Sequence, residues 1–363
     1  MAGEEIKVER ALAITTSKDK GEAVRRYLAS IDALNRNLKI EVLDDKISIP
    51  LTRPLSEEEE KHLLEVCGSY AIEYRDFKVW PKRPKSILEW LSDKLPPHVL
   101  ASVPRSWDII GDIAIVEIPD ELRGYEKLIA EAILSIHRNI KSVYAKAGAV
   151  SGDFRTRPLR LIGGEDKGIT LHREYGIKLY VNVKEAYFSP RLSYERFRVA
   201  SQVNDGEKVL DMFSGVGPFA IQIASRKSAI VYAIELNPKA YECLVKNIEL
   251  NKLKGKVIPL LGDAKEVVNE KLVGTVDRVI MNLPEKALDF IDCALKSLRG
   301  KGVLHIYLFE DEPNPMEKAE NRVLSRIEEC GWRVLKRLYR GLVKQVAPRR
   351  WQVVVDVEVH HSS

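Results

Sequence analysis

The sequence predicts an α/β fold, with an open parallel sheet in its C-terminal part and two smaller α+β domains before it. Three observations predict the sheet: four apolar runs each end in polar residues, helix-length segments separate them, and a glycine turn follows the first run. Because the carboxyl ends of parallel strands meet at one edge, these polar residues should line a ligand crevice. The 45% hydrophobic and 31% charged residues suit packed domains.

The first expected domain is residues 1–80 of the 363. Its elements are a strand at 11–14, a helix at 18–31, strands at 38–43 and 47–51, a second helix, and a strand at 70–74. Ser56 and Glu59 form a capping box that begins the second helix. Since this domain has no cluster of catalytic side-chain types, we expect it to bind a partner and not to catalyse a reaction.

The second expected domain is residues 81–198, after a basic, proline-containing linker at 78–85. We expect helices at 86–93 and 121–138, and strands at 109–119, 142–146, 159–162, 170–174 and 177–183. The domain leads into the third without a flexible linker.

The third expected domain is residues 199–363, which holds the four strands. They end at Asp211, Glu235, Gly262-Asp263 and Asn282-Leu283-Pro284. Gly215 and Gly217 permit a tight turn and a close approach to a ligand, and the acid at 235 can accept hydrogen bonds from two ribose hydroxyls. A nucleoside-cofactor site is therefore predicted. A helix at 287–298 and a strand at 303–307 should follow.

The segment 333–350 is basic and contains no acid. Its cations are Arg333, Lys336, Arg337, Arg340, Lys344, Arg349 and Arg350. Interleaved apolar residues indicate an edge strand, and the basic stripe suits contact with a nucleic acid.

Two further segments combine arginines with aromatic residues. The first, 155–160, has three arginines before a strand, which suit either a solvated face or oxyanion binding. The second, 186–198, has four aromatics, three arginines and Glu195. Either Glu195 is a helix-surface acid paired to Arg191 or Arg198, or the segment is a substrate shelf that stacks a base and takes a proton.

Charge, cysteine content and apolar runs indicate which partners and which cellular environment suit the protein. The net charge of +5 permits an anionic partner. The four cysteines, Cys67, Cys243, Cys293 and Cys330, have no metal-ligand spacing and predict reduced thiols in a cytoplasmic protein without a metal site. The charged N-terminus and the lack of a long apolar run predict neither a signal peptide nor a membrane span.

Several motifs in fixed order carry a family resemblance. They are Gly111-Asp112-Ile113-Ala114-Ile115-Val116, Phe154-Arg155-Thr156-Arg157, Tyr187-Phe188-Ser189-Pro190-Arg191-Leu192 with Glu195-Arg196, the 211–219 turn, Asn282-Leu283-Pro284 and Ala347-Pro348-Arg349. The sequence resembles the archaeal and eukaryotic tRNA (guanine-37-N1)-methyltransferase family, strongly over residues 100–357 and more loosely before them.

The resemblance implies a class I (Rossmann-like) methyltransferase domain that uses S-adenosylmethionine. It also implies a tRNA substrate whose anticodon-loop guanine is flipped into the site, and an N-terminal domain that docks on the outer corner of the tRNA. A monomer is expected.

The resemblance assigns roles to residues of this chain. Glu195 is the base that takes the N1 proton, Arg155 stabilises charge on O6, Asn282 orients the base, and Tyr187 packs near the methyl donor or the base. Asp211, Gly215 and Gly217 lie by the methionine portion of the cofactor, Glu235 by the ribose, and Asp263 by the adenine amine; Phe213, Arg196 and Asn282 complete that site.

Two positions depart from the commoner family pattern. Glu235 replaces an aspartate, and Glu285 stands where a basic or aromatic residue is usual. Because the loop at 285 touches the target base, a wyosine-pathway enzyme stays an alternative, transferring a methyl or aminocarboxypropyl group to a tricyclic guanosine derivative. Another RNA base methyltransferase, or a non-catalytic RNA-binding protein on the same scaffold, are further alternatives.

Overall fold

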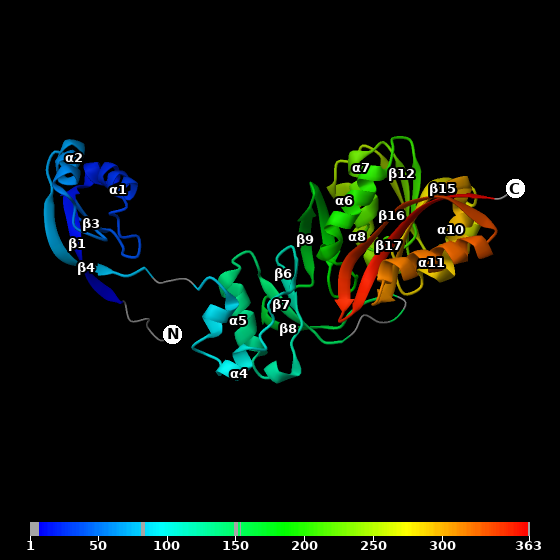
Figure 1. Cartoon of the computed structure of the whole chain (residues 1–363), viewed down its shortest axis with the longest axis horizontal. Helices are drawn as coiled ribbons and strands as arrows, with labels where there is room; N and C mark the ends of the chain where they lie inside the picture. The colour runs from blue at the N-terminus through cyan, green and yellow to red at the C-terminus, as the bar shows by residue number, and fades with distance from the viewer. Residues whose placement is uncertain (1–6, 81–83, 149–151, 153, 362–363) are drawn as a thin grey trace. The chain divides into compact units, whose positions relative to one another are not determined.

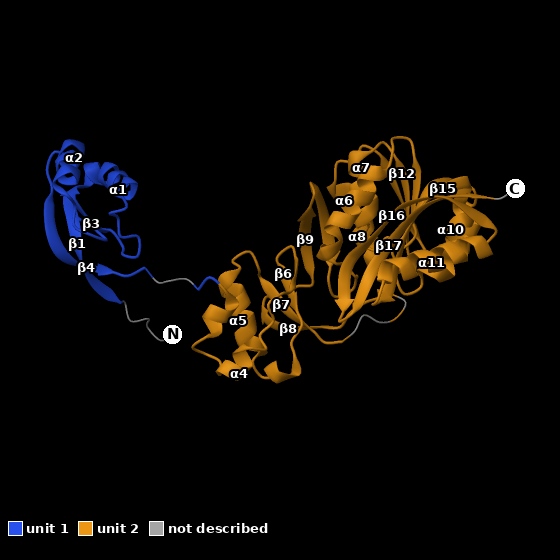
Figure 2. Ribbon diagram, viewed as in Figure 1, with its two compact units in different colours: residues 1–85 blue, residues 86–363 orange. Residues whose placement is uncertain are grey.

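The computed structural model describes residues 7–80, 84–148, 152 and 154–361, and divides into two compact units, 1–85 and 86–363 (Figure 2). The expectation about the charged N-terminus and the middle of the predicted linker, 81–83, lie outside the described residues. The second unit contains both the second and third expected domains, so the division into three stays a prediction.

Unit 1 is an antiparallel sheet with two helices packed on it. The sheet order is β2-β3-β1-β4, and the elements are β1 Val8–Ser17, η1 Lys18–Lys20, α1 Gly21–Ser30, β2 Glu41–Leu43, β3 Lys46–Pro50, α2 Glu57–Cys67 and β4 Ala71–Lys78. Ile14, Leu28 and Leu63 lie in its core. The predicted capping box is confirmed: Ser56 accepts from the Glu59 N–H, and the Glu59 carboxylate accepts from the Ser56 N–H.

Unit 2 begins with a four-stranded sheet covered by α5. Its elements are α3 Ile87–Leu91, α4 Pro97–Leu100, β5 Asp108–Ile110, β6 Ile113–Val116, η2 Asp120–Leu122, α5 Glu126–Ile136, β7 Ser142–Lys146 and β8 Leu159–Gly164. The predicted single strand at 109–119 is wrong, because β5 and β6 form a hairpin. Gly111 turns it at φ +57°, where a Cβ would lie 2.0 Å from Thr170 Oγ1.

A second hairpin, β9 Ile169–Glu174 and β10 Ile177–Asn182, is fastened to α8 Pro238–Leu250 and the residue after it. Asn247 accepts from the Tyr180 N–H at 2.6 Å, and Asn251 accepts from the Lys178 N–H at 2.9 Å. Both amides donate back to the carbonyl groups of the same two residues. These side chains satisfy the free edge of β10 as a neighbouring strand would.

The second half of unit 2 is a seven-stranded sheet in the order β13-β12-β11-β14-β15-β17-β16. The strands are β11 Lys208–Asp211, β12 Ile230–Glu235, β13 Lys256–Leu261, β14 Val276–Met281, β15 Leu298–Asp311, β16 Trp332–Ala347 and β17 Arg350–His361. All run parallel except β17, which is antiparallel to both neighbours. The predicted fold class and the predicted edge strand at 333–350 are confirmed.

Helices cover both faces of this sheet (Figure 1). One face carries α6 Ser193–Gln202, which follows η3 Pro190–Leu192, together with α7 Pro218–Arg226 and α8; the other carries α9 Ala264–Val267, η4 Val268–Leu272, η5 Ala287–Phe290, α10 Ile291–Ser297 and α11 Pro315–Glu329. Successive residues Val209 and Leu210 of β11 enter opposite cores. The sheet is thus buried on both sides, as a parallel sheet requires.

A row of paired ionisable side chains crosses this interior. Neighbouring atoms are separated by 2.8 Å (Glu207–Arg278), 2.9 Å (Arg278–His305), 2.8 Å (His305–Asp356), 2.6 Å (Asp356–Arg198) and 2.6 Å (Arg198–Glu195). Because arginine only donates, His305 accepts through Nε2, and we assign its proton to Nδ1, facing Asp356. Each buried charge thereby has an opposite or polar partner.

Candidate active site

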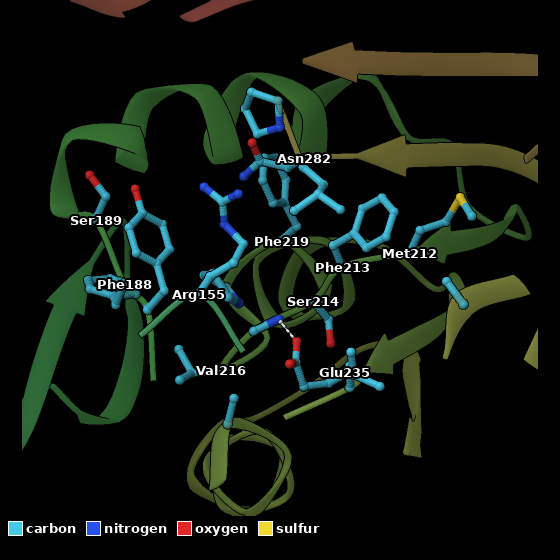
Figure 3. Close-up of a pocket in the computed structure, with 18 of the residues that line it drawn as sticks. Arg155, Phe188, Ser189, Met212, Phe213, Ser214, Val216, Phe219, Glu235 and Asn282 are labelled. Atoms are coloured by element: carbon cyan, nitrogen blue, oxygen red, sulfur yellow. Dashed lines mark hydrogen bonds between the residues drawn. The ribbon is translucent and has the colours of Figure 1, made fainter. Parts of the chain in front are cut away.

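A cavity of about 210 Å³ lies at the carboxyl ends of β11, β12 and β14, where the strand order reverses (Figure 3). Eight predicted site residues line it: Arg155, Tyr187, Arg196, Phe213, Gly215, Glu235, Asp263 and Asn282. Glu195, Asp211 and Gly217 do not line it. Most of the residues singled out in the sequence therefore come together.

The turn after β11 depends on its two glycines. Gly215 has φ +56°, and its N–H donates to Glu235 Oε2 at 2.6 Å (Figure 3). Gly217 has φ +83° and caps α7; a Cβ there would lie 2.3 Å from Leu244 Cδ1. Any other residue at 217 would meet both backbone strain and a buried neighbour.

The two acids at the ends of β12 and β13 are held by backbone N–H groups. Glu235 accepts from Gly215 and, at 2.8 Å, from Asn237, and burial raises the pKa of its carboxyl. Asp263 caps α9 through Oδ1, which accepts from Lys265 at 2.8 Å. Since each carboxylate oxygen can accept two hydrogen bonds, both acids can still bind ligand hydroxyl or amino groups.

Asp211, at the end of β11, is fully buried, and neither of its Oδ atoms has a hydrogen-bond partner among the described residues. The Oγ of Ser214, three residues later, is also buried and has no hydrogen-bond partner among the described residues. Burial and then the nearby Glu235 charge raise the pKa of Asp211 to about 7. A buried carboxylate without a donor is costly, and a ligand cation would supply one.

Apolar and aromatic groups complete the cavity wall. Phe213 and Phe290 contact edge to face at a centroid distance of 5.0 Å, and Phe219 and Leu236 lie on the same lining. Such walls suit a flat heterocycle, whereas the acids suit hydroxyl and amino groups. The adenine and ribose of S-adenosylmethionine therefore match the aromatic rings and carboxylates that line this cavity.

A second cavity, of about 410 Å³, adjoins the first and shares Arg155, Tyr187 and Ser189 with it. Its charged lining residues are mainly cations. Its other basic residues are Lys146, Arg157, Arg191, Lys344 and Arg350, and its acids are Asp108 and Glu285. Lys344 Nζ lies 3.3 Å from both the Tyr187 hydroxyl and Ser189 Oγ, so β16 contributes to this wall. The two cavities together can hold a cofactor beside an anionic substrate.

Asn282 is oriented by a residue that the sequence patterns did not reveal. Gln352 on β17 is buried, and its Nε2 donates to Asn282 Oδ1 at 3.0 Å. The amide of Asn282 is therefore set with its Nδ2 as a donor for a ligand. No motif pointed to Gln352, because its contact joins strands 70 residues apart.

Arg196 lines the cavity but its guanidinium faces protein groups. It forms a bidentate pair with Glu174 of β9, donates to the Ser189 carbonyl at 3.2 Å and lies 5.0 Å from the Phe188 ring centroid. Burial alone would raise the pKa of Glu174, but His172 and Arg196 hold it below its usual range. Arg196 thus fixes the 187–190 segment that carries Tyr187.

Glu195 lies in α6 with its side chain turned to the sheet interior. Its carboxylate accepts from Arg198 at 2.6 and 3.0 Å and from the Tyr307 hydroxyl at 2.7 Å. The proposed pairing with Arg198 is thus present, but Glu195 is 6% exposed rather than a surface acid. The other suggested partner, Arg191, pairs with Asp108 at 2.6 Å instead.

Other predictions can be compared with the described residues. Cys67, Cys243 and Cys293 are buried free thiols, and Cys330 is partly buried. No described helix is long and apolar enough to cross a membrane. Within the described ranges, no three His, Cys, Asp or Glu side chains converge as metal ligands.

Family models match three consecutive parts of the chain. Residues 13–59 match the tRNA methyltransferase 5 N-terminal domain, 87–167 the TYW2 N-terminal domain, and 170–335 the TRM5/TYW2 methyltransferase domain. The last of these contains β11 to β14 and hence the cavity described above.

Individual relatives extend this similarity to nearly the whole chain. The tRNA (guanine(37)-N(1))-methyltransferase Trm5b of Pyrococcus abyssi is 38% identical over 96% of this chain and 99% of its own length. A solved complex of aTrm5 and tRNALeu is 34% identical, with a TM-score of 0.74 over 96% of this chain and 99% of that one.

A relative with different chemistry matches less of the chain. The tRNA(Phe) (4-demethylwyosine(37)-C(7)) aminocarboxypropyltransferase of Methanocaldococcus jannaschii is 34% identical over 69% of this chain and 96% of its own length. Its own length is nearly exhausted by that match, so it has no counterpart for roughly a third of this chain.

Proposed function

The chain belongs to the TRM5/TYW2 methyltransferase family, and from that premise we infer that it methylates N1 of guanine 37 in tRNA, with S-adenosylmethionine as the donor. The observation that carries this function is the near full-length match to a tRNA (guanine(37)-N(1))-methyltransferase. The aminocarboxypropyltransferase relative shares only 69% of this chain. The chain is thus an S-adenosylmethionine-dependent enzyme of tRNA modification.

For the cofactor, we propose the first cavity. When bound, S-adenosylmethionine supplies an electrophilic methyl group on a sulfonium. Glu235, with both oxygens oriented by backbone N–H groups, would accept from the ribose hydroxyls. Asp263 would accept from the adenine amine. Asp211 is buried behind the lining of the cavity, so its pairing with the ammonium group would require the wall in front of it to open. Phe213 and Phe290 would hold the ring.

For the target base, we propose the junction of the two cavities. Arg155 lines both, so its guanidinium would face O6 as the guanine loses its N1 proton. The free amide of Asn282 would donate to the base edge, and Tyr187 would pack on its face. Holding the nucleophilic nitrogen close to the donor supplies most of what a methyl transfer requires.

Glu195 stays the proposed proton acceptor, and the structure defines what this role demands. Three acceptor positions of its carboxylate are used by Arg198 and Tyr307. The side chain would therefore turn from these donors towards the cavity when the base enters. Arg198 would keep Asp356 as its partner, at 2.6 Å, so the turn would leave no unpaired cation.

For the RNA, we propose that the second cavity and the basic face of β16 contact phosphates near the anticodon, while unit 1 docks on the outer corner of the tRNA. The cations that line the second cavity support its part in this arrangement. A monomer working in the cytoplasm completes the proposal, and light scattering of the purified protein, alone and with tRNA, would test the oligomeric part.

The function is tested with tRNA transcripts that carry guanine or adenine at position 37. After incubation with methyl-labelled cofactor, nucleoside analysis should find label only with guanine, as 1-methylguanosine. Label on a carbon of a tricyclic base, or transfer of an aminocarboxypropyl group, would identify the wyosine-pathway alternative. S-adenosylmethionine should also raise the melting temperature of the protein, as a ligand of the native state does. No shift would favour the alternative of a non-catalytic RNA-binding protein.

A further inference from the structure

An ion pair joins the two loops at the mouth of the site. Arg155 NH1 lies 2.7 Å from Oε2 of Glu285, which is 130 residues away in the sequence. Arg155 belongs to the segment between β7 and β8, and Glu285 follows the Asn282-Leu283-Pro284 end of β14. The pair therefore links the proposed O6 donor to the loop that carries Asn282.

The charge of Glu285 is unexpected at this place. The charged residues that line the second cavity are mainly cations, and the other acid among its described lining residues, Asp108, is neutralised by Arg191 at 2.6 Å. A carboxylate in a cationic cavity weakens the attraction for an anionic polymer. The side chain of Glu285 is 53% exposed, so packing inside the protein does not explain why an acid stands at this position. Among the described residues, the ion pair with Arg155 is the interaction that explains an acid at position 285.

Arg155 itself needs restraint. Its backbone has φ +52°, in the left-handed region that a residue with a Cβ seldom occupies. Besides Glu285, its guanidinium has the Tyr187 ring, with the centroid 5.9 Å away. A side chain with four rotatable bonds on a strained backbone would otherwise sample several positions. Glu285 is the charged group that selects one of them.

We propose that Glu285 is a positioning residue, which holds the Arg155 guanidinium at the junction of the two cavities, ready for the oxygen of the target base. This inference rests on the proposed function for its catalytic consequence. Glu285 occupies NH1 only, so the remaining N–H groups of Arg155 stay free for O6. Glu285 thus fixes a donor without consuming it.

Tryptic cleavage after Arg155 tests the pairing without any need for activity. In Glu285→Ala the Arg155–Thr156 bond should be cut several-fold faster than in the native protein, because the side chain and its segment lose their anchor. Glu285→Gln, which keeps an acceptor, should fall between them. The matched control is Glu329→Ala, which removes an exposed acid paired with Arg326 at 2.9 Å. Equal cleavage in all four proteins would overturn the proposal.

Single-turnover methylation tests the catalytic consequence. Glu285→Ala should lower the rate constant about tenfold or more, as small misplacements of a catalytic donor do. The KM for tRNA should stay level or fall, since a negative charge leaves a cationic cavity. In Arg155→Ala the second change, Glu285→Ala, should add little further loss.

Two kinetic results would contradict the proposal. An unchanged rate with a lower KM would mean that Glu285 only repels RNA, and multiplying losses in the double variant would mean that the two residues act independently. If the native protein makes no 1-methylguanosine, the proposed function fails, and the cleavage comparison still decides whether Glu285 holds Arg155.

Discussion

At the scale of single residues, Glu195 carries the sharpest prediction. Glu195→Gln keeps the size of the side chain but removes the proposed proton acceptor, so the methylation rate should fall by about 10²–10⁴-fold. The dissociation constants for tRNA and cofactor should stay close to native, because Arg198 retains Asp356. The measurement is single-turnover methylation beside equilibrium binding, with Glu329→Gln as the control. A parallel loss of binding would show that Glu195 is structural.

Asp211 predicts a pH-dependent cofactor affinity. Its pKa of about 7 in the protein without ligand means that it is largely protonated below neutrality. Pairing with a cation requires the ionised form, so the dissociation constant of S-adenosylmethionine should fall about tenfold between pH 5.5 and pH 7. Calorimetry should also detect proton release on binding. Asp211→Asn should bind weakly and without this dependence; a flat native profile would contradict the pairing.

The same shift has a consequence for stability. A carboxyl group whose pKa is raised on folding binds more protons in the folded state than in the unfolded one. The protein without ligand should therefore lose stability as pH rises from about 4 to about 7, by up to about 4 kcal/mol from this group, and change little above that range. Denaturant unfolding of the native protein and Asp211→Asn across these pH values would measure the difference.

At the scale of secondary structure elements, the β16–β17 hairpin predicts the salt dependence of RNA binding. Arg349 and Arg350 lie at its turn, and Arg350 lines the second cavity. Replacing both by glutamine should reduce the slope of log K against log salt by about 0.7–0.9 for each lost phosphate contact. The catalytic rate at saturating tRNA should change little. An unchanged slope would assign both arginines to the fold alone.

The elements that the sequence predicted are those with a periodic or terminal signal. The four parallel strands were recognisable from the polar residues that end them, and Ser56 with Glu59 marked a helix start. The hairpin at Gly111 was missed, although Gly111-Asp112 separates the two apolar runs and is a local turn signal. Helix α11 and strand β17 were not singled out, although together they cover and extend the sheet.

The candidate site was predictable in its residues more than in their contacts. The glycine turn and the acids at 211, 235 and 263 follow from local pattern. In contrast, the Gln352–Asn282 and Glu285–Arg155 contacts join positions 70 and 130 residues apart, and no spacing encodes them. Likewise, Glu195 pairs with Arg198 and not with Arg191. The partner of Arg191 is Asp108 of β5, which lies far away in the sequence.

At the scale of the whole molecule, the two units predict separable contributions to RNA binding. Unit 1 has its own core, and a relative of nearly the length of unit 2 matches 69% of the chain. A chain of residues 86–363 should bind S-adenosylmethionine with native affinity but show a higher KM for full-length tRNA. With an isolated anticodon stem-loop, the short and full chains should behave alike. A native KM for full-length tRNA would exclude a docking role for unit 1.

The row of paired side chains from Glu207 to Glu195, which are charged except for the neutral His305, has a consequence for heat tolerance. The hydration that such charges lose on folding becomes less favourable as temperature rises, so the penalty for burying them shrinks on heating. Apolar packing gains no comparable advantage over the same range. The contribution of this row to the free energy of unfolding should therefore become more favourable on heating and less favourable on cooling towards freezing.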